Sequence, residues 1–344
     1  MKNILFIGTS KSPLSIERYN LIKDHVKYEH IYFYDLAKNM KEFIYIDISK
    51  GKLQHIIDFI HIVYIIKKLK ITHLHYHGAN HLFVNFAPLL YKNLCVIVTV
   101  QGSEINDAYN GKNKLFVDYL LKDADIITVK SNFLKSKVKS IIKKSSNLVN
   151  LNWGIDENLF NMQKNNQSKT NKINIISFRG STYPYNIDIV FQAIKRLKEN
   201  FKNINFTYVE FNKTSDVILD MNIVDKHYKE LSKNKLFEIL KEQDIMISIP
   251  SYDGFATSIM ESLALGVLPV ISDLPSYKKE NLDSVVEKIE NIDSISLYSK
   301  ISEILTDNLT IYERSKRALF AMSHYGREKQ IKILKDLYEN CGSN

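Results

Sequence analysis

The sequence predicts two α/β domains, each built on a doubly wound parallel sheet, and three observations lead to this fold class. The chain has 344 residues, a length that suits about two domains of ~150 residues each. Short runs rich in β-branched and aromatic residues alternate with longer helical stretches, and this series occurs twice. Between the two series lies NMQKNNQSKTN (161–171), a polar segment without hydrophobic periodicity. Strands that alternate with helices imply βαβ units and parallel sheets.

The first series precedes the polar segment, and helix-like stretches at 56–70 and 133–144 separate its later members. Its expected strands are NILFIG (3–8), HIYFYD (30–35), HLHY (73–76), CVIVTV (95–100), DIITV (125–129) and LVNL (148–151). They predict an N-terminal Rossmann-like domain over residues 1–160, followed by a linker over 161–171.

The second series restarts after the linker, with helices expected from about Asp188 and near 232–242. Its expected strands are INIISF (173–178), INFTYV (204–209), DIMISI (244–249) and LPVI (268–271). They predict a C-terminal Rossmann-like domain over 172–325. The last segment, 326–344, is expected to form a helix that can pack back on the first domain. Two such domains place a cleft between the carboxyl ends of their sheets, where ligands bind.

The composition argues against several classes of protein. Hydrophobic residues make up 45% of the chain and charged residues 25%, so each half can bury a core and a wholly disordered chain is disfavoured. The net charge of +9 favours anionic partners, but the chain is crowded with Lys, Asn and Ile in general. Because the basic residues are scattered and no recognised module is present, we expect no nucleic-acid partner.

The cysteines and apolar tracts indicate a cytoplasmic protein. Cys95 lies in an apolar run and is expected in the core, and the two cysteines give no disulfide framework or zinc spacing, which fits a reducing cytosol. We expect no signal peptide at the start, MKNILFIGTS, and the longest apolar tract, 53–69, is interrupted by His, Asp and Lys. The basic stretch 133–144 can rest on the anionic inner face of a membrane or simply pack on the core.

The segment SYDGFATSIMESLALGVLPVISD (251–273) carries the strongest functional signal. A buried strand precedes it, Asp253-Gly254 indicates a turn, and Ser258-x-x-Glu261 matches a capping box, so a helix is expected to begin near 256–258. A glycine-bearing loop before a helix N-terminus binds a diphosphate without a metal. Asp253 and Glu261 then suit a sugar hydroxyl and a ribose diol. The plainer alternative is a common Asp-Gly turn and a Glu that only caps its helix.

This segment resembles glycosyltransferase family 4, whose C-terminal domain carries E-G-F-G, a Glu eight positions after the first, and A-x-x-x-G-x-P-V. The corresponding residues here are Asp253-Gly254-Phe255-Ala256, Glu261, Gly266 and Pro269-Val270. The resemblance implies the GT-B fold, with two Rossmann-like domains facing a cleft, and a retaining transfer from a nucleotide sugar. It also implies that Asp253 contacts the donor sugar and Glu261 the ribose. Asp253 is one methylene shorter than the family's Glu.

Further stretches of the second half carry the same resemblance. Trp153-Gly154-Ile155-Asp156, followed by Phe160, is similar to the family's N-G-I-D…F, and Phe178-Arg179 to its G-R, where the Arg binds the diphosphate. Pro184 and Tyr185 stand where the usual Lys would be. The implied donor-binding residues are Gly8, Arg179, Tyr185, Pro250, Asp253, Gly254, Phe255, Ala256, Thr257, Ser258 and Glu261.

In the first half, Gln101-Gly102-Ser103-Glu104 resembles the family's H-G-x-D loop. Gln101 replaces the His and can donate a hydrogen bond, but it cannot act as an acid or base at neutral pH. Gly8-Thr9 stands where the family has a glycine loop. The implied catalytic residues are Arg179, Asp253 and Gln101, and the implied acceptor-side residues are His77, Gly78, Gly102 and Glu104.

No metal or cofactor is expected. Asp123-Ala124-Asp125 precedes a strand rather than following one, so it indicates a solvated turn instead of a metal-binding D-x-D. The histidines at 73, 75, 77 and 81 have no acidic or Cys partner at ligand spacing.

The resemblance implies a retaining, hexosyltransferase-type enzyme. The donor favoured is a UDP-sugar, and the acceptor is a glycan or lipid-linked glycan of bacterial surface polysaccharide or glycoconjugate synthesis. No general base is evident, and the leaving phosphate can take the acceptor proton. Two alternatives stay open: a nucleotide-sugar epimerase of GT-B-like fold and a non-catalytic nucleotide-sugar-binding protein.

Overall fold

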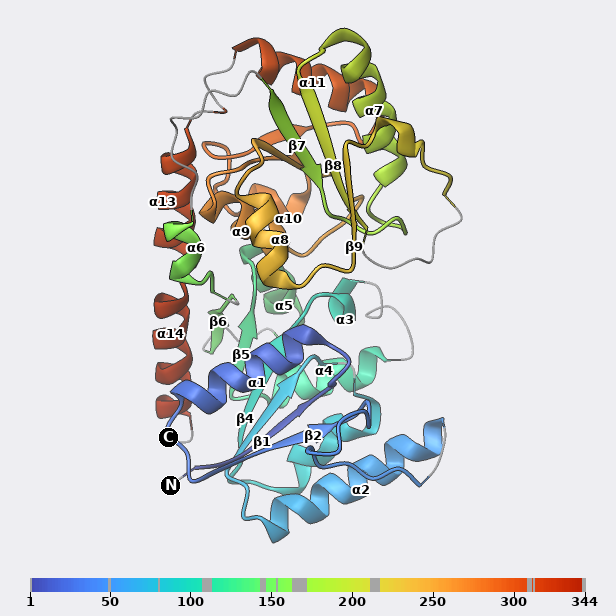
Figure 1. Ribbon diagram of the computed structural model, residues 1–344. Coiled ribbons are helices and arrows are strands. Elements are labelled where there is room, and N and C mark those ends of the chain that lie inside the picture. Colours follow the sequence, from blue (N-terminus) through green and yellow to red (C-terminus); the bar gives the residue numbers. More distant parts are fainter. Residues whose placement is uncertain are drawn as a thin grey trace. The chain divides into compact units, whose positions relative to one another are not determined.

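The chain forms two compact units, each with its own six-stranded parallel sheet (Figure 1). The computed structural model describes residues 2–48, 51–79, 81–106, 113–142, 147–152, 154–162, 172–210, 217–307, 311 and 313–341. The first unit comprises 1–153 and 328–344, and the second comprises 154–327. The predicted fold class, two doubly wound α/β domains, is therefore confirmed. Each unit is described by itself below.

The first unit contains the sheet with strand order β2-β1-β3-β4-β5-β6. Neighbouring strands are parallel, and β1 lies between β2 and β3, with Ile4 opposite Ile31 on one side and His73 on the other. The chain therefore reverses its direction of winding between β1 and β3. The strands are β1 (Asn3–Gly8), β2 (His30–Asp35), β3 (His73–His77), β4 (Cys95–Val100), β5 (Ile126–Val129) and β6 (Leu148–Asn150).

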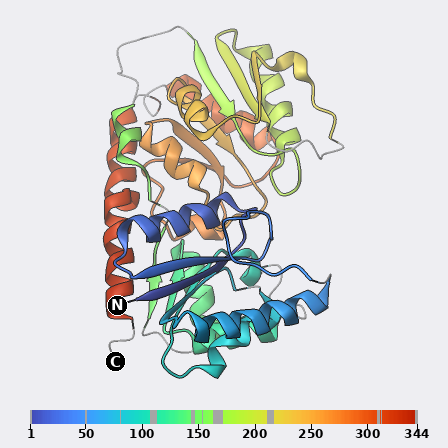
Figure 2. The ribbon, with the colours of Figure 1, turned by 60° about the horizontal axis from the view of Figure 1, so that its bottom comes forward.

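Helices cover both faces of this sheet, with α1 and α2 on opposite sides (Figures 1 and 2). Ser12 caps α1 by accepting a hydrogen bond from the Ser15 backbone N–H, and Pro13 occupies its first turn. The last helix, α14, packs on the α1 face through Leu334 and Tyr338. The helices are α1 (Pro13–His25), α2 (Lys52–Lys68), η1 (Leu82–Leu90), α3 (Ser103–Asn106), α4 (Lys114–Asp123), α5 (Asn132–Ile142) and α14 (Arg327–Asn340).

A disulfide between Cys95 and Cys341 corrects one expectation. Cys95 is buried as expected, but the structure joins it to Cys341, with the two Cα atoms 5.8 Å apart. The two residues are 246 positions apart in the sequence, so no local spacing indicates the pair. They meet because the end of α14 returns to the edge of the sheet at which β4 begins.

Reducing this disulfide is expected to lower the free energy of unfolding of the first unit by about 2–4 kcal/mol, because the bond limits the freedom of the unfolded chain. Urea unfolding with and without dithiothreitol measures this difference. Cys341→Ser is expected to match the reduced wild type and to lose its response to dithiothreitol, since the chain has two cysteines in all. Wild-type unfolding curves that coincide with and without dithiothreitol would contradict the prediction.

The second unit contains the sheet with strand order β12-β11-β10-β7-β8-β9. Its winding reverses between β10 and β7, so the carboxyl ends of these two strands form the switch point where ligands bind in such sheets. The strands are β7 (Ile173–Ser177), β8 (Ile204–Glu210), β9 (Lys226–Lys229), β10 (Ile245–Ser248), β11 (Leu268–Ser272) and β12 (Glu287–Ile289). The sequence did not indicate β9 and β12.

Two hydrophobic clusters cover the two faces of this sheet. Residues of α8, α9 and α13 pack on one face, and residues of α7 and α11 pack on the other. Figure 1 shows α7 and α11 on one side of β7 and β8, and α8 and α9 on the other. The helices are α6 (Glu157–Asn161), α7 (Ile187–Asn200), η2 (Met221–Ile223), α8 (Lys233–Leu240), α9 (Thr257–Ala264), α10 (Pro275–Lys278), α11 (Ser294–Asp307) and α13 (Arg314–Tyr325).

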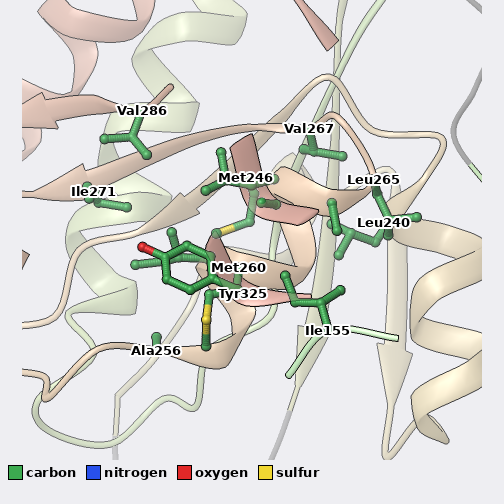
Figure 3. Packing of buried hydrophobic residues seen from close by; sticks show 14 of the residues in the cluster. Ile155, Leu240, Met246, Ala256, Met260, Leu265, Val267, Ile271, Val286 and Tyr325 are labelled. Atoms are coloured by element: carbon green, nitrogen blue, oxygen red, sulfur yellow. The ribbon is translucent and has the colours of Figure 1, made fainter. Parts of the chain in front are cut away.

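The boundary between the units corrects the predicted one at residue 160. Ile155 pairs with Gly326 in a β-bridge and lies in the same buried cluster as Met260 and Tyr325 (Figure 3). Leu159 of α6 joins that cluster as well, so this segment belongs to the second unit. Trp153 and most of the expected linker lie outside the described residues. Within the described part of the chain, no helix is long and apolar enough to cross a membrane.

Candidate functional site

Helix α9 is held firmly at its carboxyl end. Gly266 adopts a φ of +76° just after the helix, and the N–H groups of Gly266 and Val267 donate to the carbonyls of Leu263 and Ser262. This is the Schellman arrangement, which favours glycine. A Cβ at this position would also lie 2.8 Å from the Cβ of Arg314. Both the positive φ and the lack of space therefore favour glycine here.

The amino end of α9 differs from the predicted capping box. The helix begins at Thr257 with Ala256 as its N-cap, and no side chain caps it. Ser258 therefore lies inside the first turn, where its hydroxyl cannot act as the cap, and Glu261 lies one turn further on. Among the described residues, no side chain caps the first N–H groups of the helix, which makes this end suited to an anion.

Phe255 sets the path of the chain into α9. Its φ is +131°, a backbone conformation that residues other than glycine rarely adopt. The ring is 1% exposed and packs against Tyr277 and Tyr325, with centroids 6.1 and 5.5 Å away. The Asp253 carboxylate accepts a hydrogen bond from the Phe255 backbone N–H at 3.1 Å. Buried packing and this bond hold a strained backbone at the predicted site, as is typical of functional loops.

Arg179 and Asp253 lie together at the switch point of the sheet. Arg179 follows β7, and its Nε donates to the hydroxyl of Ser248, the last residue of β10, at 2.8 Å. Its Nη2 lies 3.4 Å from Asp253 Oδ2, and both side chains are 15% exposed. The guanidinium also stacks over the Tyr185 ring, 5.4 Å from its centroid. The structure thus brings together three of the predicted donor-site residues and adds Ser248.

Tyr277 of α10 is a member of the site that sequence analysis missed. It is fully buried, and burial, reinforced by the negative charge of Asp253, raises the pKa of its hydroxyl well above 10. The hydroxyl therefore stays protonated at any physiological pH, and among the described residues its oxygen is buried without a hydrogen-bond partner. No local pattern marks this residue, since it follows Asp253 by more than 20 positions.

Glu261 is paired across two helices. Its Oε1 lies 3.2 Å from the Lys233 ammonium at the start of α8, with Glu261 14% exposed and Lys233 55% exposed. A mostly buried carboxylate beside a cation can accept hydrogen bonds from the two hydroxyl groups of a diol. The cation can contact an anion at the same time. Lys233 was not predicted, because nothing near it in the sequence indicates α9 as its neighbour.

The loops around the switch point are tied to the sheet and to each other. The Ser272 hydroxyl donates to the Pro250 carbonyl at 2.7 Å. The Asn186 side-chain amide donates to the Ile249 carbonyl at 2.8 Å, and the Ser251 N–H donates to the Pro184 carbonyl at 2.8 Å. Predicted residue Pro250 therefore lies on a loop whose position is fixed on both sides.

In the first unit, the loop at 101–104 is organised around Glu104. This carboxylate is 2% exposed and accepts hydrogen bonds from the backbone N–H groups of Gln101 and Gly102, both at 2.8 Å, and of Ala79 at 3.3 Å. The geometry favours a loop-shaping role for Glu104 over an acceptor contact. Within the described residues, the Gln101 side-chain nitrogen is buried without a hydrogen-bond partner.

The other first-unit candidates are closely packed. Gly8 has no room for a side chain, because a Cβ would lie 2.3 Å from the Ser15 hydroxyl oxygen. Gly78 has a φ of +96°, and its N–H donates to the Thr99 carbonyl. His77 is 5% exposed, and burial, with the nearby charge of Arg18, lowers its pKa well below 6.5, so it is neutral.

The first unit contains the aspartates and histidines that were weighed above as metal ligands. Asp123 ends α4, and Asp125 accepts a hydrogen bond from the Val96 backbone N–H at 2.7 Å, as a helix–strand turn would. Burial and Arg18 lower the pKa of His75 to about 3, and its ring nitrogens bond Tyr338 and Thr99. Among the described residues, Cys95, Cys341 and Asp125 bring ligand-type atoms within 4.8 Å, but the two sulfurs are joined to each other.

A model of a known protein family matches most of the second unit. Residues 159–327 match the model of the family described as glycosyl transferases group 1. This stretch contains Arg179, Asp253, Glu261 and all the other second-unit site residues named above. No curated protein sequence matches the chain.

Solved structures with a similar fold have low sequence identity. HepE from Anabaena, in complex with UDP, is 11% identical with a TM-score of 0.77, covering 98% of this chain and 100% of that one. A glycosyltransferase from Rickettsia africae is 14% identical with a TM-score of 0.72 over 98% and 99%. A UDP-N-acetylglucosamine 2-epimerase is 14% identical with a TM-score of 0.66 over 98% and 95%. The chain therefore has the two-domain α/β fold of GT-B type.

Proposed function

We propose that this protein is a retaining glycosyltransferase of family 4 that transfers a hexosyl group from a UDP-sugar. The observation that carries the proposal is the group formed by the uncapped N-terminus of α9, the Arg179–Asp253 pair and the Glu261–Lys233 pair. It provides donors for a diphosphate and carboxylates for hydroxyl groups within the stretch that matches the glycosyl transferase family model.

In this proposal each residue has a separate task. The Arg179 guanidinium and the first N–H groups of α9 stabilise the charge that develops on the leaving diphosphate as the C1–O bond of the donor breaks. Asp253 accepts a donor-sugar hydroxyl, with the protonated hydroxyl of Tyr277 nearby. Glu261 accepts the ribose hydroxyls, and Lys233 adds positive charge beside the phosphates. The acceptor oxygen forms the new bond to C1 on the face that the diphosphate leaves, and the leaving phosphate oxygen takes the acceptor proton, so no side chain serves as base.

The acceptor in this proposal is a glycan or a lipid-linked glycan of the bacterial surface. Helix α5 carries Lys135, Lys137 and Lys139 beside the buried Leu134 and Val138. Such a basic surface suits peripheral contact with an anionic membrane. Gln101, Gly8, His77 and Gly78 are proposed as first-unit contributors through the resemblance alone.

A thermal-shift screen tests the donor site. UDP-, GDP-, ADP-, dTDP- and CMP-sugars are added to wild type, and the matching series is expected to stabilise the protein by about 2.7 kcal/mol at a hundredfold excess over Kd. Glu261→Ala is expected to lose this shift, whereas Glu199→Ala, an exposed Glu on α7, keeps it. If no series shifts the melting temperature, the proposed donor site is wrong, and the protein does not bind these nucleotide sugars.

Two alternatives are separated by product analysis. Epimerisation is the second candidate because the fold is similar to that of a UDP-N-acetylglucosamine 2-epimerase. An epimerase would change the configuration of the free donor sugar without transferring it. A non-catalytic binder would bind the donor but neither transfer nor slowly hydrolyse it. Release of UDP together with a glycosylated or hydrolysed sugar supports the transferase.

A further inference from the structure

Two exposed aromatic rings lie beside the donor site and have no role in the scheme above. Tyr183 is 75% exposed and Tyr252 is 42% exposed. Their ring centroids are 5.7 Å apart, with the planes inclined by 59°. Tyr183 lies on the loop after β7 and Tyr252 on the loop after β10, so the pair lies at the switch point of the sheet. Exposed aromatic rings beside a ligand site are a frequent means of recognition.

Hydrogen bonds between the two loops fix the backbone next to the two rings. The Ser251 N–H donates to the Pro184 carbonyl at 2.8 Å. The Asn186 amide donates to the Ile249 carbonyl at 2.8 Å and to the Ser251 hydroxyl at 3.0 Å. Each ring is therefore next to a fixed segment of backbone, and little loop ordering remains to oppose binding.

The position of the pair indicates which part of a ligand it meets. Glu261 and Lys233, the proposed ribose side, lie on α9 and α8, which pack on one face of the sheet. Tyr183 lies on the loop that enters α7, and α7 packs on the opposite face. Tyr252 directly precedes Asp253, the proposed contact of the donor sugar. The rings therefore lie toward the sugar end of the diphosphate and away from the nucleoside end.

We propose that Tyr183 and Tyr252 form an aromatic platform that stacks against a pyranose ring. The negative face of an aromatic ring attracts the slightly positive C–H groups on the apolar face of a pyranose. The inference rests on the proposed function, and it adds a sugar-binding element made of two residues that are not among the motif positions matched to family 4. The pyranose is either the donor sugar or a sugar of the acceptor, and the two sources give different results below.

The test compares wild type with Tyr183→Ala/Tyr252→Ala. Calorimetry measures the Kd of UDP and of UDP-glucose, UDP-galactose and UDP-N-acetylglucosamine. Saturation-transfer NMR, with UDP present, measures contact with methyl glucopyranoside, galactopyranoside and mannopyranoside. Tyr183→Phe/Tyr252→Phe keeps both rings, and Tyr64→Ala removes an exposed tyrosine of the first unit, 56% exposed. Because the targeted rings are exposed, all variants are expected to melt within a few degrees of wild type.

If the donor sugar stacks on the platform, the Ala variant binds UDP as wild type does, but the affinity gain of the UDP-sugar over UDP falls about tenfold. If an acceptor sugar stacks there, that gain is unchanged and the NMR contact with the pyranosides is lost. The Phe variant and Tyr64→Ala behave as wild type in both cases. An Ala variant that matches wild type in both measurements overturns the platform, and so does one whose affinity for UDP itself falls. Failure of wild type to bind UDP rejects the proposed function instead, and the pyranoside contact still decides the platform.

Discussion

Arg179→Ala is expected to lower kcat/KM for sugar transfer by about a thousandfold, the effect of removing one well-placed donor to developing negative charge. The guanidinium is held by Ser248, Asp253 and Tyr185, so it is preorganised and has little freedom to lose at the moment of reaction. Steady-state kinetics with the donor found in the thermal-shift screen measures the effect. Most of the loss is expected in kcat, because the charge on the diphosphate grows as the bond breaks.

Two further variants sharpen this test. Arg179→Lys is expected to recover only part of the loss, because an ammonium cannot bond Ser248 and stack on Tyr185 with the same geometry. Arg196→Ala is the matched control: Arg196 also stacks over a tyrosine ring, Tyr298, at 5.3 Å, but it lies on α7 away from Asp253. If Arg179→Ala keeps kcat/KM within a few-fold of the Arg196→Ala value, the assigned role is wrong.

The meeting of Arg179 and Asp253 could be predicted from the sequence because both follow buried strands. The runs before them are apolar and rich in Ile, so each predicts a strand of a parallel sheet. The carboxyl ends of such strands share one edge, and the switch point brings the two neighbouring loops together. Strands β9 and β12 were missed for the opposite reason. Their sequences, KHYK and EKI, are polar and short, as the outermost strands of a sheet often are.

The start of α9 shows where a local motif misleads. Ser258 and Glu261 have the spacing of a capping box, which predicts Ser258 as the N-cap. In the structure the helix begins at Thr257, within the expected range, but its N-cap is Ala256 and not Ser258. The buried ring of Phe255 holds the backbone just before this N-cap at a positive φ. Tertiary packing thus overrides the local signal, and it leaves the helix end uncapped at the site where an anion is proposed to bind. Tyr277 and Lys233 were missed for a similar reason, since only packing brings them near the loop.

Asp253→Asn is expected to lower kcat/KM about a hundredfold or more while changing the melting temperature little. The asparagine oxygen can still accept from the Phe255 N–H, as Asp253 Oδ1 does at 3.1 Å, so the loop keeps its shape. The change removes the charge that faces Arg179 and the acceptor for a sugar hydroxyl. The Arg179–Asp253 contact is long, at 3.4 Å, and Arg179 keeps its bond to Ser248 and its stack on Tyr185 in this variant, so we expect the loss of stability to be small. Activity and stability should therefore separate in this variant.

Asp293→Asn provides the control for the backbone contact. Asp293 Oδ1 accepts a hydrogen bond from the N–H of Ile295 at 2.9 Å, with the same two-residue spacing. It lies before α11, and no site residue contacts it in the described part of the chain.

Asp253→Glu tests the departure from the family residue. Its extra methylene moves the carboxylate, so it cannot hold both the Phe255 N–H and Arg179 as Asp253 does, and we expect reduced transfer or a changed preference among donor sugars. Wild-type kinetics and preference in both Asp253 variants would mean that the carboxylate does not contact the sugar, and Asp253 would then only shape the loop.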